Sequence, residues 1–240
     1  MMRIRIAISV AFTGFVLLSN TLLRAQFQEP TKDELQMTAD SKAPGAAAVY
    51  LYREETTDDN LHFHSLYVRL KVLTEKGKEL ATVRMPYESK DFKITDIRGR
   101  TIHADGTVIP LTAKPSDLTD VKTKDFQENT IVFTLPSVEV GSILEYRLQE
   151  RYDDNMVSSP FWDVQQPYYV HKAHYMFSPS EHSYGITNSR GDNLNRLMWM
   201  VHTGSDAKVV KDSRNHYTFD VTDVPAIPSE DWMPPLNSLN

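Results

Sequence analysis

Histidines that lie close together in the sequence are the first residues that could do chemistry. His62 and His64 are two positions apart, so in a strand both side chains would point the same way and could ligate a transition metal. They share parity with the apolar positions that follow, which favours ordinary packing at the entrance of a strand. His171 and His174 are three positions apart and would point to opposite faces. Because the sequence places no third ligand beside either pair, we expect no metal site.

Paired acids are the second candidate, because glycosidases use two carboxylates. The pairs are Glu54–Glu55, Asp58–Asp59 and Asp153–Asp154. Adjacent residues point apart in a strand, and acids are abundant in loops that face solvent. We therefore interpret these residues as solvated loop acids.

The sequence contains no motif typical of a catalytic nucleophile or of a cofactor-binding site. The chain has no cysteine, which excludes disulfides, thiolate zinc sites and a cysteine nucleophile. Ser142 follows Gly141 but lacks the second glycine of a nucleophile elbow, and neither phosphate-binding glycine motif occurs. We expect a protein that is not an enzyme and has no cofactor. Its 26 basic and 32 acidic residues give a net charge of −6, the wrong sign for binding nucleic acid.

The N-terminus has the pattern of a secretory signal peptide. Basic residues precede an apolar run at residues 6–18, which is shorter than the roughly 20 residues that cross a bilayer. Residues 1–25 therefore predict a signal peptide cleaved between Ala25 and Gln26, with a signal anchor as the alternative. We expect an exported protein, periplasmic or extracellular, with no transmembrane segment after cleavage.

Alternating apolar and polar residues then predict strands. Residues 66–72 and 81–85 both alternate, and residues 75–78 between them have hairpin length, which predicts an antiparallel pair. Residues 92–102 and 108–111 flank an Asp-Gly turn and predict a second hairpin. Further strands are predicted at residues 131–135, 144–148, 168–177, 197–202 and 217–221, with a polar loop at 112–128.

Eight or more short strands without a long amphipathic helix predict an all-β fold, an antiparallel β-sandwich. A short N-terminal helix is expected where Thr31 and Glu34 form a capping box. Turn residues at 153–167 mark a seam between two sheets or two packed subdomains. The mature chain divides into a polar lead-in at 26–46, a β-rich domain at 47–223 and a proline-rich strap or linker at 224–240.

Aromatic residues are the main candidates for a binding surface, because interfaces and sugar-binding sandwiches are rich in exposed rings. The candidate interface residues are Phe161, Trp162, Tyr168, Tyr169 and Trp232. Burial in a sandwich core is the alternative for the first four. Trp232 should be covered, since disordered tails are poor in large apolar residues.

Five segments resemble, in the same order, the β-rich domain that stands N-terminal to transglutaminase-like cores in exported bacterial proteins. They are KAPGAAAVYLYREE, RLKVLTEKGKELATVRMPY, RTIHADGTVIPL, LPSVEVGSILEYRL and SPFWDVQQPYYVHKAHYMFSP. The resemblance covers roughly residues 45–225 and implies a secreted, sandwich-like domain followed by a papain-like Cys-His-Asp domain. This chain has no cysteine and ends where that domain would begin. The resemblance therefore implies the architecture and the localisation of this chain, but not a catalytic activity.

The sequence thus favours an exported, non-catalytic accessory domain. Its expected partner is a downstream transglutaminase-like domain, in cis or in trans. A secreted carbohydrate- or surface-binding β-sandwich and a hydrolase with an unrecognised site are the alternatives.

Overall fold

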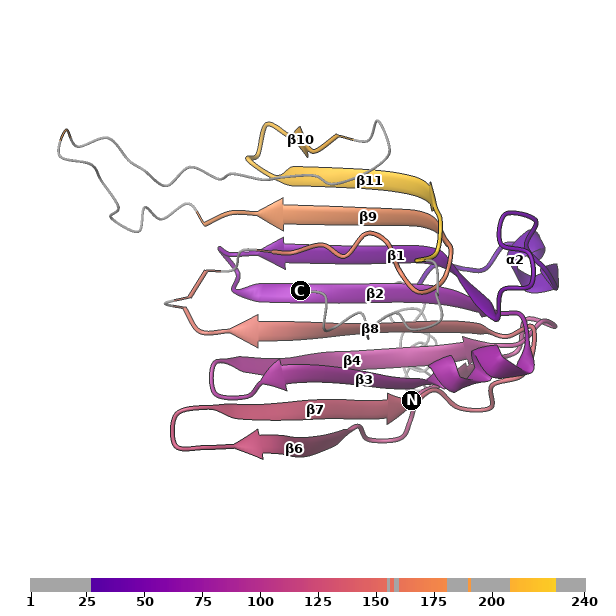
Figure 1. Cartoon of the computed structure of the whole chain (residues 1–240), viewed down its shortest axis with the longest axis horizontal. Coiled ribbons are helices and arrows are strands. Elements are labelled where there is room, and N and C mark those ends of the chain that lie inside the picture. The colour runs from indigo at the N-terminus through magenta and orange to yellow at the C-terminus, as the bar shows by residue number, and fades with distance from the viewer. Residues whose placement is uncertain (1–26, 155, 158–159, 181–189, 191–207, 228–240) are drawn as a thin grey trace, which may run out of the picture.

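The computed structural model forms two β-sheets and little helix (Figure 1). It describes residues 27–154, 156–157, 160–180, 190 and 208–227. The predicted all-β fold class is confirmed. The expected helix is α2 (Lys32–Gln36), and its capping box is formed by Thr31 and Glu34, each side chain accepting from the other's backbone N–H. The strand predicted at 197–202 lies outside the described residues.

The larger sheet has eight strands. Their order is β10 (Val210–Lys211), β11 (Tyr217–Val224), β9 (Val170–Ser178), β1 (Ala48–Asp58), β2 (Phe63–Val72), β8 (Ile143–Tyr152), β4 (Phe92–Ile102) and β5 (Val108–Pro110). The predicted β4–β5 hairpin is confirmed. Neighbours are antiparallel except β1 and β9, which run parallel, so the sheet is mixed and not purely antiparallel as predicted.

The smaller sheet has three antiparallel strands. Their order is β3 (Thr82–Glu88), β7 (Gln127–Thr134) and β6 (Ser116–Lys122). The prediction of a loop at 112–128 is wrong, because β6 lies within it. Every residue of β6 is exposed, so no apolar alternation marks this strand in the sequence.

The predicted hairpin of residues 66–72 and 81–85 is also wrong. β2 pairs with β1 and β8, whereas β3 pairs with β7 in the other sheet. The connection forms a 3-10 helix, η1 (Glu75–Ala81). Gly77 brings this helix against the residue before β1, since a Cβ there would lie 2.2 Å from the carbonyl oxygen of Ala47. A tight tertiary contact thus replaces the expected turn.

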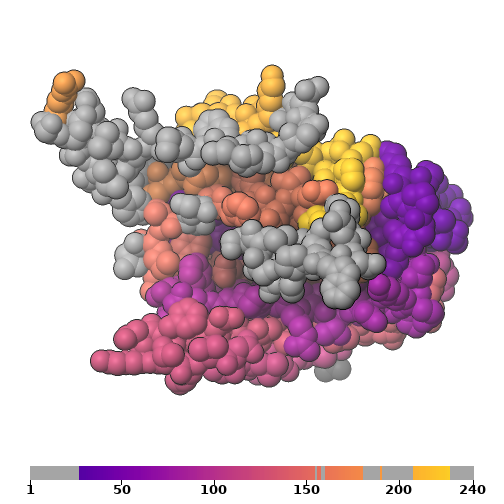
Figure 2. Space-filling model, in the orientation of Figure 1, coloured from indigo at the N-terminus to yellow at the C-terminus, as the bar shows by residue number. Residues whose placement is uncertain are grey.

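The core lies between the two sheets. We call the face of the large sheet toward the small sheet its inner face. On β2 this face carries Leu66, Val68, Leu70 and Val72, which pack with Val83, Ile131, Phe133, Leu144 and Leu148. Burying one such side chain stabilises the fold by about 1.5–3 kcal/mol, so this cluster holds the sheets together. The small sheet packs on the part of the inner face formed by β2 and β8. The strands β9 and β11 form the opposite part of the large sheet (Figure 2).

The connection between β8 and β9 must recross the sheet. Both strands run in the direction of β1, and β1 and β2 lie between them, so the chain must return along the sheet before β9 can start. Figure 1 shows residues 160–169 crossing in front of β1. The predicted seam at 153–167 does not separate two sheets, because β8 and β9 belong to the same one.

Candidate functional site

The crossover at residues 160–169 positions the aromatic residues that the sequence singled out. Trp162 is partly buried, and its ring centroid lies 5.3 Å from that of Tyr175 on β9. The backbone N–H of Ile227 donates to the carbonyl oxygen of Gln166, which holds the segment further along. Phe161, by contrast, is 75% exposed. A large apolar side chain therefore projects from a segment that is anchored behind it.

The other predicted interface residues are placed differently. Tyr168 is partly buried and packs against the core between the sheets. Tyr169 is buried, and its hydroxyl donates to Asp223 at 3.0 Å. Trp232 lies outside the described residues. Of the four described aromatics, only Phe161 offers a mostly exposed ring.

A pocket of about 160 Å³ adjoins Phe161 and Trp162 on the inner face, and we call it the His64 pocket. Its charged lining comes from three adjacent strands: Glu55 of β1, His64 of β2 and Glu150 of β8. The register puts these side chains together, because Glu55 lies opposite Leu66 and His64 lies opposite Glu150. Aromatic side chains complete the walls: Phe92, Tyr152, Phe161 and Trp162.

Glu55 is the better compensated of the two carboxylates. Arg53 donates to its Oε1, and Nε2 of His64 lies 3.4 Å from its Oε2. Burial by itself would raise the pKa of Glu55, but the contacts with His64 and Arg53 outweigh burial and lower the pKa. Glu55 is therefore ionised at neutral pH.

Glu150 has much less compensation. Within the described part of the chain, the only charged group at ion-pair distance is His64, whose Nδ1 lies 4.0 Å from Oε2 of Glu150. Burial raises the pKa of Glu150, and His64 offsets only part of that effect. Two carboxylates with pKa shifts of opposite sign thus flank one imidazole, an arrangement suited to pairing with a polar ligand.

His62 and His64 do not share a strand. His62 precedes β2 in a turn, with φ at 54°, and its ring packs edge-on against Tyr152 with centroids 5.7 Å apart. The other two histidines contact acids: His171 contacts Asp40, and His174 contacts Asp220. The structure groups no three metal-ligating side chains in its described ranges.

The interpretation of the paired acids as solvated loop residues is wrong for two of them. Glu55 is 5% exposed and Asp59 is 3% exposed. The hydroxyl of Tyr152 donates to Asp59 at 2.7 Å. Parity was an available signal for Glu150, which shares the inner face of β8 with Leu148, but not for Glu55, because a bulge between Tyr50 and Tyr52 shifts the alternation along β1.

A second group of buried charges lies on the outer face of the large sheet. Glu145 accepts from Nε of Arg100 at 2.5 Å and from the hydroxyl of Tyr67, and Arg69 lies 3.8 Å away. Both arginines also donate to the carbonyl oxygen of Gln28. The N-terminal segment thereby closes over these charges, which we call the Glu145 network.

Lys71 extends this arrangement along β2. It is fully buried, and its Nζ donates to the carbonyl oxygens of Leu35 at 2.9 Å and Gly141 at 2.5 Å. Burial lowers the pKa of Lys71 to about 8. These bonds tie α2 and the loop before β8 to the sheet, so we assign the region a structural role.

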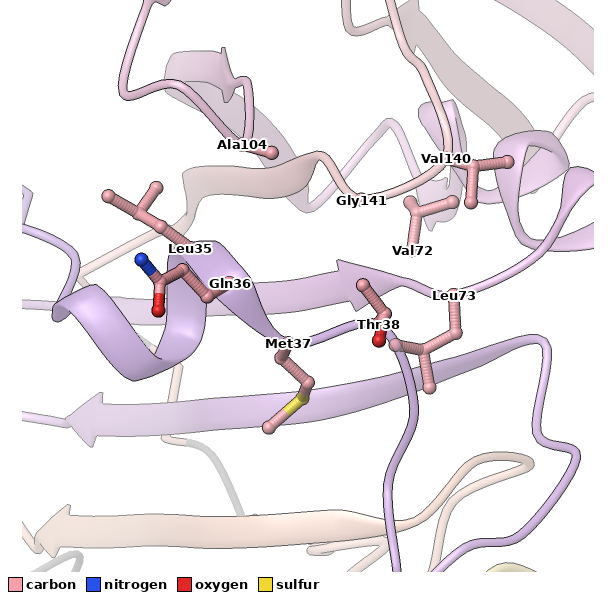
Figure 3. Close-up of a pocket in the computed structure, with 9 residues that line it drawn as sticks. All are labelled: Leu35, Gln36, Met37, Thr38, Val72, Leu73, Ala104, Val140 and Gly141. Atoms are coloured by element: carbon pink, nitrogen blue, oxygen red, sulfur yellow. The ribbon is translucent and has the colours of Figure 1, made fainter.

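An apolar pocket of about 310 Å³ lies beside this tether. Its lining side chains include Leu35 of α2, Met37 just after α2, Leu73 after β2, Ala104 between β4 and β5, and Val140 before β8 (Figure 3). None of the described residues that line this pocket carries a charge. Because orientation and specificity come from placed polar groups, the His64 pocket is the better candidate site.

Comparison with known proteins finds a solved structure with a similar fold and a matching family model. A solved structure from Parabacteroides distasonis ATCC 8503, described as a "putative protease", matches with a TM-score of 0.60 and 13% identity. The match covers 78% of this chain and 38% of that one, so this chain spans well under half of that protein's length. At this identity the likeness shows the fold alone.

No curated protein matches the sequence. No helix in the described ranges has the length and apolar character needed to cross a membrane. A family model for a domain of unknown function with solved structure, DUF3857, matches residues 59–228. The chain therefore belongs to the DUF3857 family.

Proposed function

We propose that this chain is an exported, non-catalytic accessory domain that docks a transglutaminase-like catalytic domain, in cis or in trans. The observation that carries the proposal is Phe161, which is 75% exposed next to a pocket and projects from an anchored segment. Protein interfaces are commonly centred on a few large aromatic anchors held by a rigid scaffold.

Two further observations support this role. The fold matches part of a larger protein described as a "putative protease", which is what an associated domain would give. The chain also has no cysteine, so a papain-like nucleophile would have to come from the partner domain.

Export is part of the proposal and rests on the signal-peptide pattern of residues 1–25. Phe27 is 8% exposed and packs beside Tyr67, so a cut between Ala25 and Gln26 would leave the folded lead-in intact. N-terminal sequencing of the exported protein should begin at Gln26. Recovery of an uncleaved, membrane-bound chain would overturn the export proposal.

Site-specific photo-crosslinking tests the docking proposal. A benzophenone amino acid at position 161 should crosslink, in cells that export the protein, to a peptide from a transglutaminase-like domain. The matched control is position 210 on β10, where Val210 is 59% exposed. Absence of such a peptide at 161, or equal yields at 161 and 210, would contradict docking through this surface.

Carbohydrate binding is the second candidate, because an exposed ring beside carboxylates also suits a sugar. A glycan array with the mature chain separates the two candidates. Glycan binding that is lost with Phe161→Ala, combined with no crosslink at 161, would favour the carbohydrate-binding function.

A further inference from the structure

The His64 pocket has an imbalance of charge that a ligand could remove. Glu55 already pairs with Arg53, whereas Glu150 has only His64, at 4.0 Å. The charged and ionisable groups among the described lining residues are therefore two carboxylates and one imidazole, and the nearby guanidinium of Arg53 is already engaged by Glu55. An incoming cation would give Glu150 a full partner, whereas an incoming anion would meet two negative groups.

The aromatic walls favour the same ligand. Phe92, Phe161 and Trp162 all line the pocket, and aromatic faces attract cations. Trp162 is held in place by its stacking on Tyr175. A cation between these rings and Glu150 would form a cation–π contact with the rings and an ion pair with the carboxylate.

One buried polar group next to this wall, Nε1 of Trp162, lacks a hydrogen-bond partner in the described part of the chain. An indole N–H can only donate, so it needs an acceptor oxygen. Buried polar groups are rarely left unpaired, which points to a ligand that brings an acceptor as well as a positive charge.

The size of the pocket limits the ligand further. At about 160 Å³, it is well below the roughly 300–1,000 Å³ of pockets that enclose a drug-sized molecule. It has room for the head and part of the stem of one long side chain.

We infer that the His64 pocket binds an alkylammonium group, with Glu150 as its charge partner and the rings of Phe161 and Trp162 as its walls. A lysine side chain of a peptide fits best, because the peptide also carries carbonyl acceptors for the indole of Trp162. This inference deepens the proposed function. It rests on that function in one respect, because the docked protein is the source of the lysine. The chemistry of the pocket can nevertheless be tested without any partner domain.

The test is an NMR titration of the mature chain that follows the indole N–H of Trp162, assigned with Trp162→Phe. The probes are Nα-acetyl-lysine N-methylamide, its Nε-acetylated form, and n-butylamine. We expect a saturable shift with the first probe, none with the acetylated form, and weaker binding of n-butylamine, which has no carbonyl. Saturable binding of the neutral form, or no shift with any probe, would overturn the inference. Equal affinity for n-butylamine would overturn the lysine-residue assignment in favour of a simple amine.

Variants identify the carboxylate. Glu150→Gln keeps the shape of the side chain and should weaken binding by about tenfold, which corresponds to the loss of one modest charge contact. The matched control is Glu139→Gln, an exposed acid in the loop before β8, at the other end of that strand. Phe161→Ala provides a second, surface variant that should also weaken binding. Unchanged affinity in both pocket variants would contradict the site, while a failed crosslink at 161 with intact lysine binding would contradict only the docking proposal.

Discussion

Two charge clusters in the described part of the chain lie on opposite faces of one sheet and differ in how completely they are paired. In the Glu145 network, the carboxylate meets Arg100 and Tyr67, and Glu34 and the backbone of the N-terminal segment accept from further guanidinium donors, although Nε of Arg69 has no described partner. In the His64 pocket, Glu150 has one distant histidine, and the indole of Trp162 has no described partner. The Glu145 network, whose charges are paired within the chain, stabilises the fold. The His64 pocket, whose charges are poorly paired, can bind a ligand.

The largest effect should come from breaking the closed cluster. Glu145→Ala leaves Arg100 buried without its carboxylate and Arg69 with only Glu34, which should lower the free energy of unfolding by about 3–5 kcal/mol. Urea unfolding of the mature chain measures this, with Glu139→Ala as the exposed control. A loss similar to that of the control would show that the outer-face charges do not hold the fold together.

Lys71, which ties α2 to the sheet, should give the next largest effect on stability, and this effect depends on pH. Because the pKa of Lys71 falls to about 8 in the folded chain, the unfolded chain binds more protons between pH 8 and the ordinary lysine range. The contribution of Lys71 to stability should therefore rise with pH across that window, by on the order of 2 kcal/mol. Urea titrations at several pH values should show this rise in wild type relative to Lys71→Met; parallel curves would contradict it.

Glu150 should behave in the opposite way to Glu145. Its pKa is raised in the folded chain, so its ionisation costs stability as pH rises above the ordinary glutamate range. Glu150→Gln removes this cost and should leave stability at pH 7 unchanged or raise it by up to about 1 kcal/mol. The gain over wild type should vanish at low pH, where Glu150 is protonated in both states. A clear loss of stability at pH 7 would show that Glu150 is structural and would remove the contrast between the clusters.

The smallest effect on stability is expected at the exposed ring. Phe161→Ala should change the free energy of unfolding by no more than about 0.5 kcal/mol, because little of that side chain is buried. The same change should abolish the crosslinks formed through this surface, scored with the photoreactive residue moved to a neighbouring exposed position, Asp163. A large loss of stability would mean that Phe161 is covered in solution.

The local alternation of apolar and polar residues predicted where the strands lie better than it predicted which strands pair with each other. The alternation at 66–72 located β2, but the sequence neighbour that looked like its hairpin partner pairs with β7 instead. Pairing is decided by contacts far apart in the chain, such as Gly77 against Ala47. The parallel pairing of β9 with β1 was hidden because the described residues between β8 and β9 form no crossover helix.

The candidate site was predicted only in part. The sequence drew attention to Phe161, Trp162 and His64, since aromatic clusters and closely spaced histidines are visible locally. Glu55 and Glu150 join them only because β1 and β8 flank β2, a fact of topology. The parity of Glu150 with Leu148 was a local clue, and it indicates a charge on the inner face without identifying its partners.

Hydrogen exchange of the mature chain, with and without saturating Nα-acetyl-lysine N-methylamide, tests the contrast between the two faces most directly. Mass spectrometry resolves the exchange by segment. The account predicts slower exchange at residues 55–64 and 160–169 when the ligand is bound, and no change at residues 27–36, which cover the Glu145 network. Slower exchange at 27–36, or no change at 55–64 and 160–169 under saturation, would contradict it.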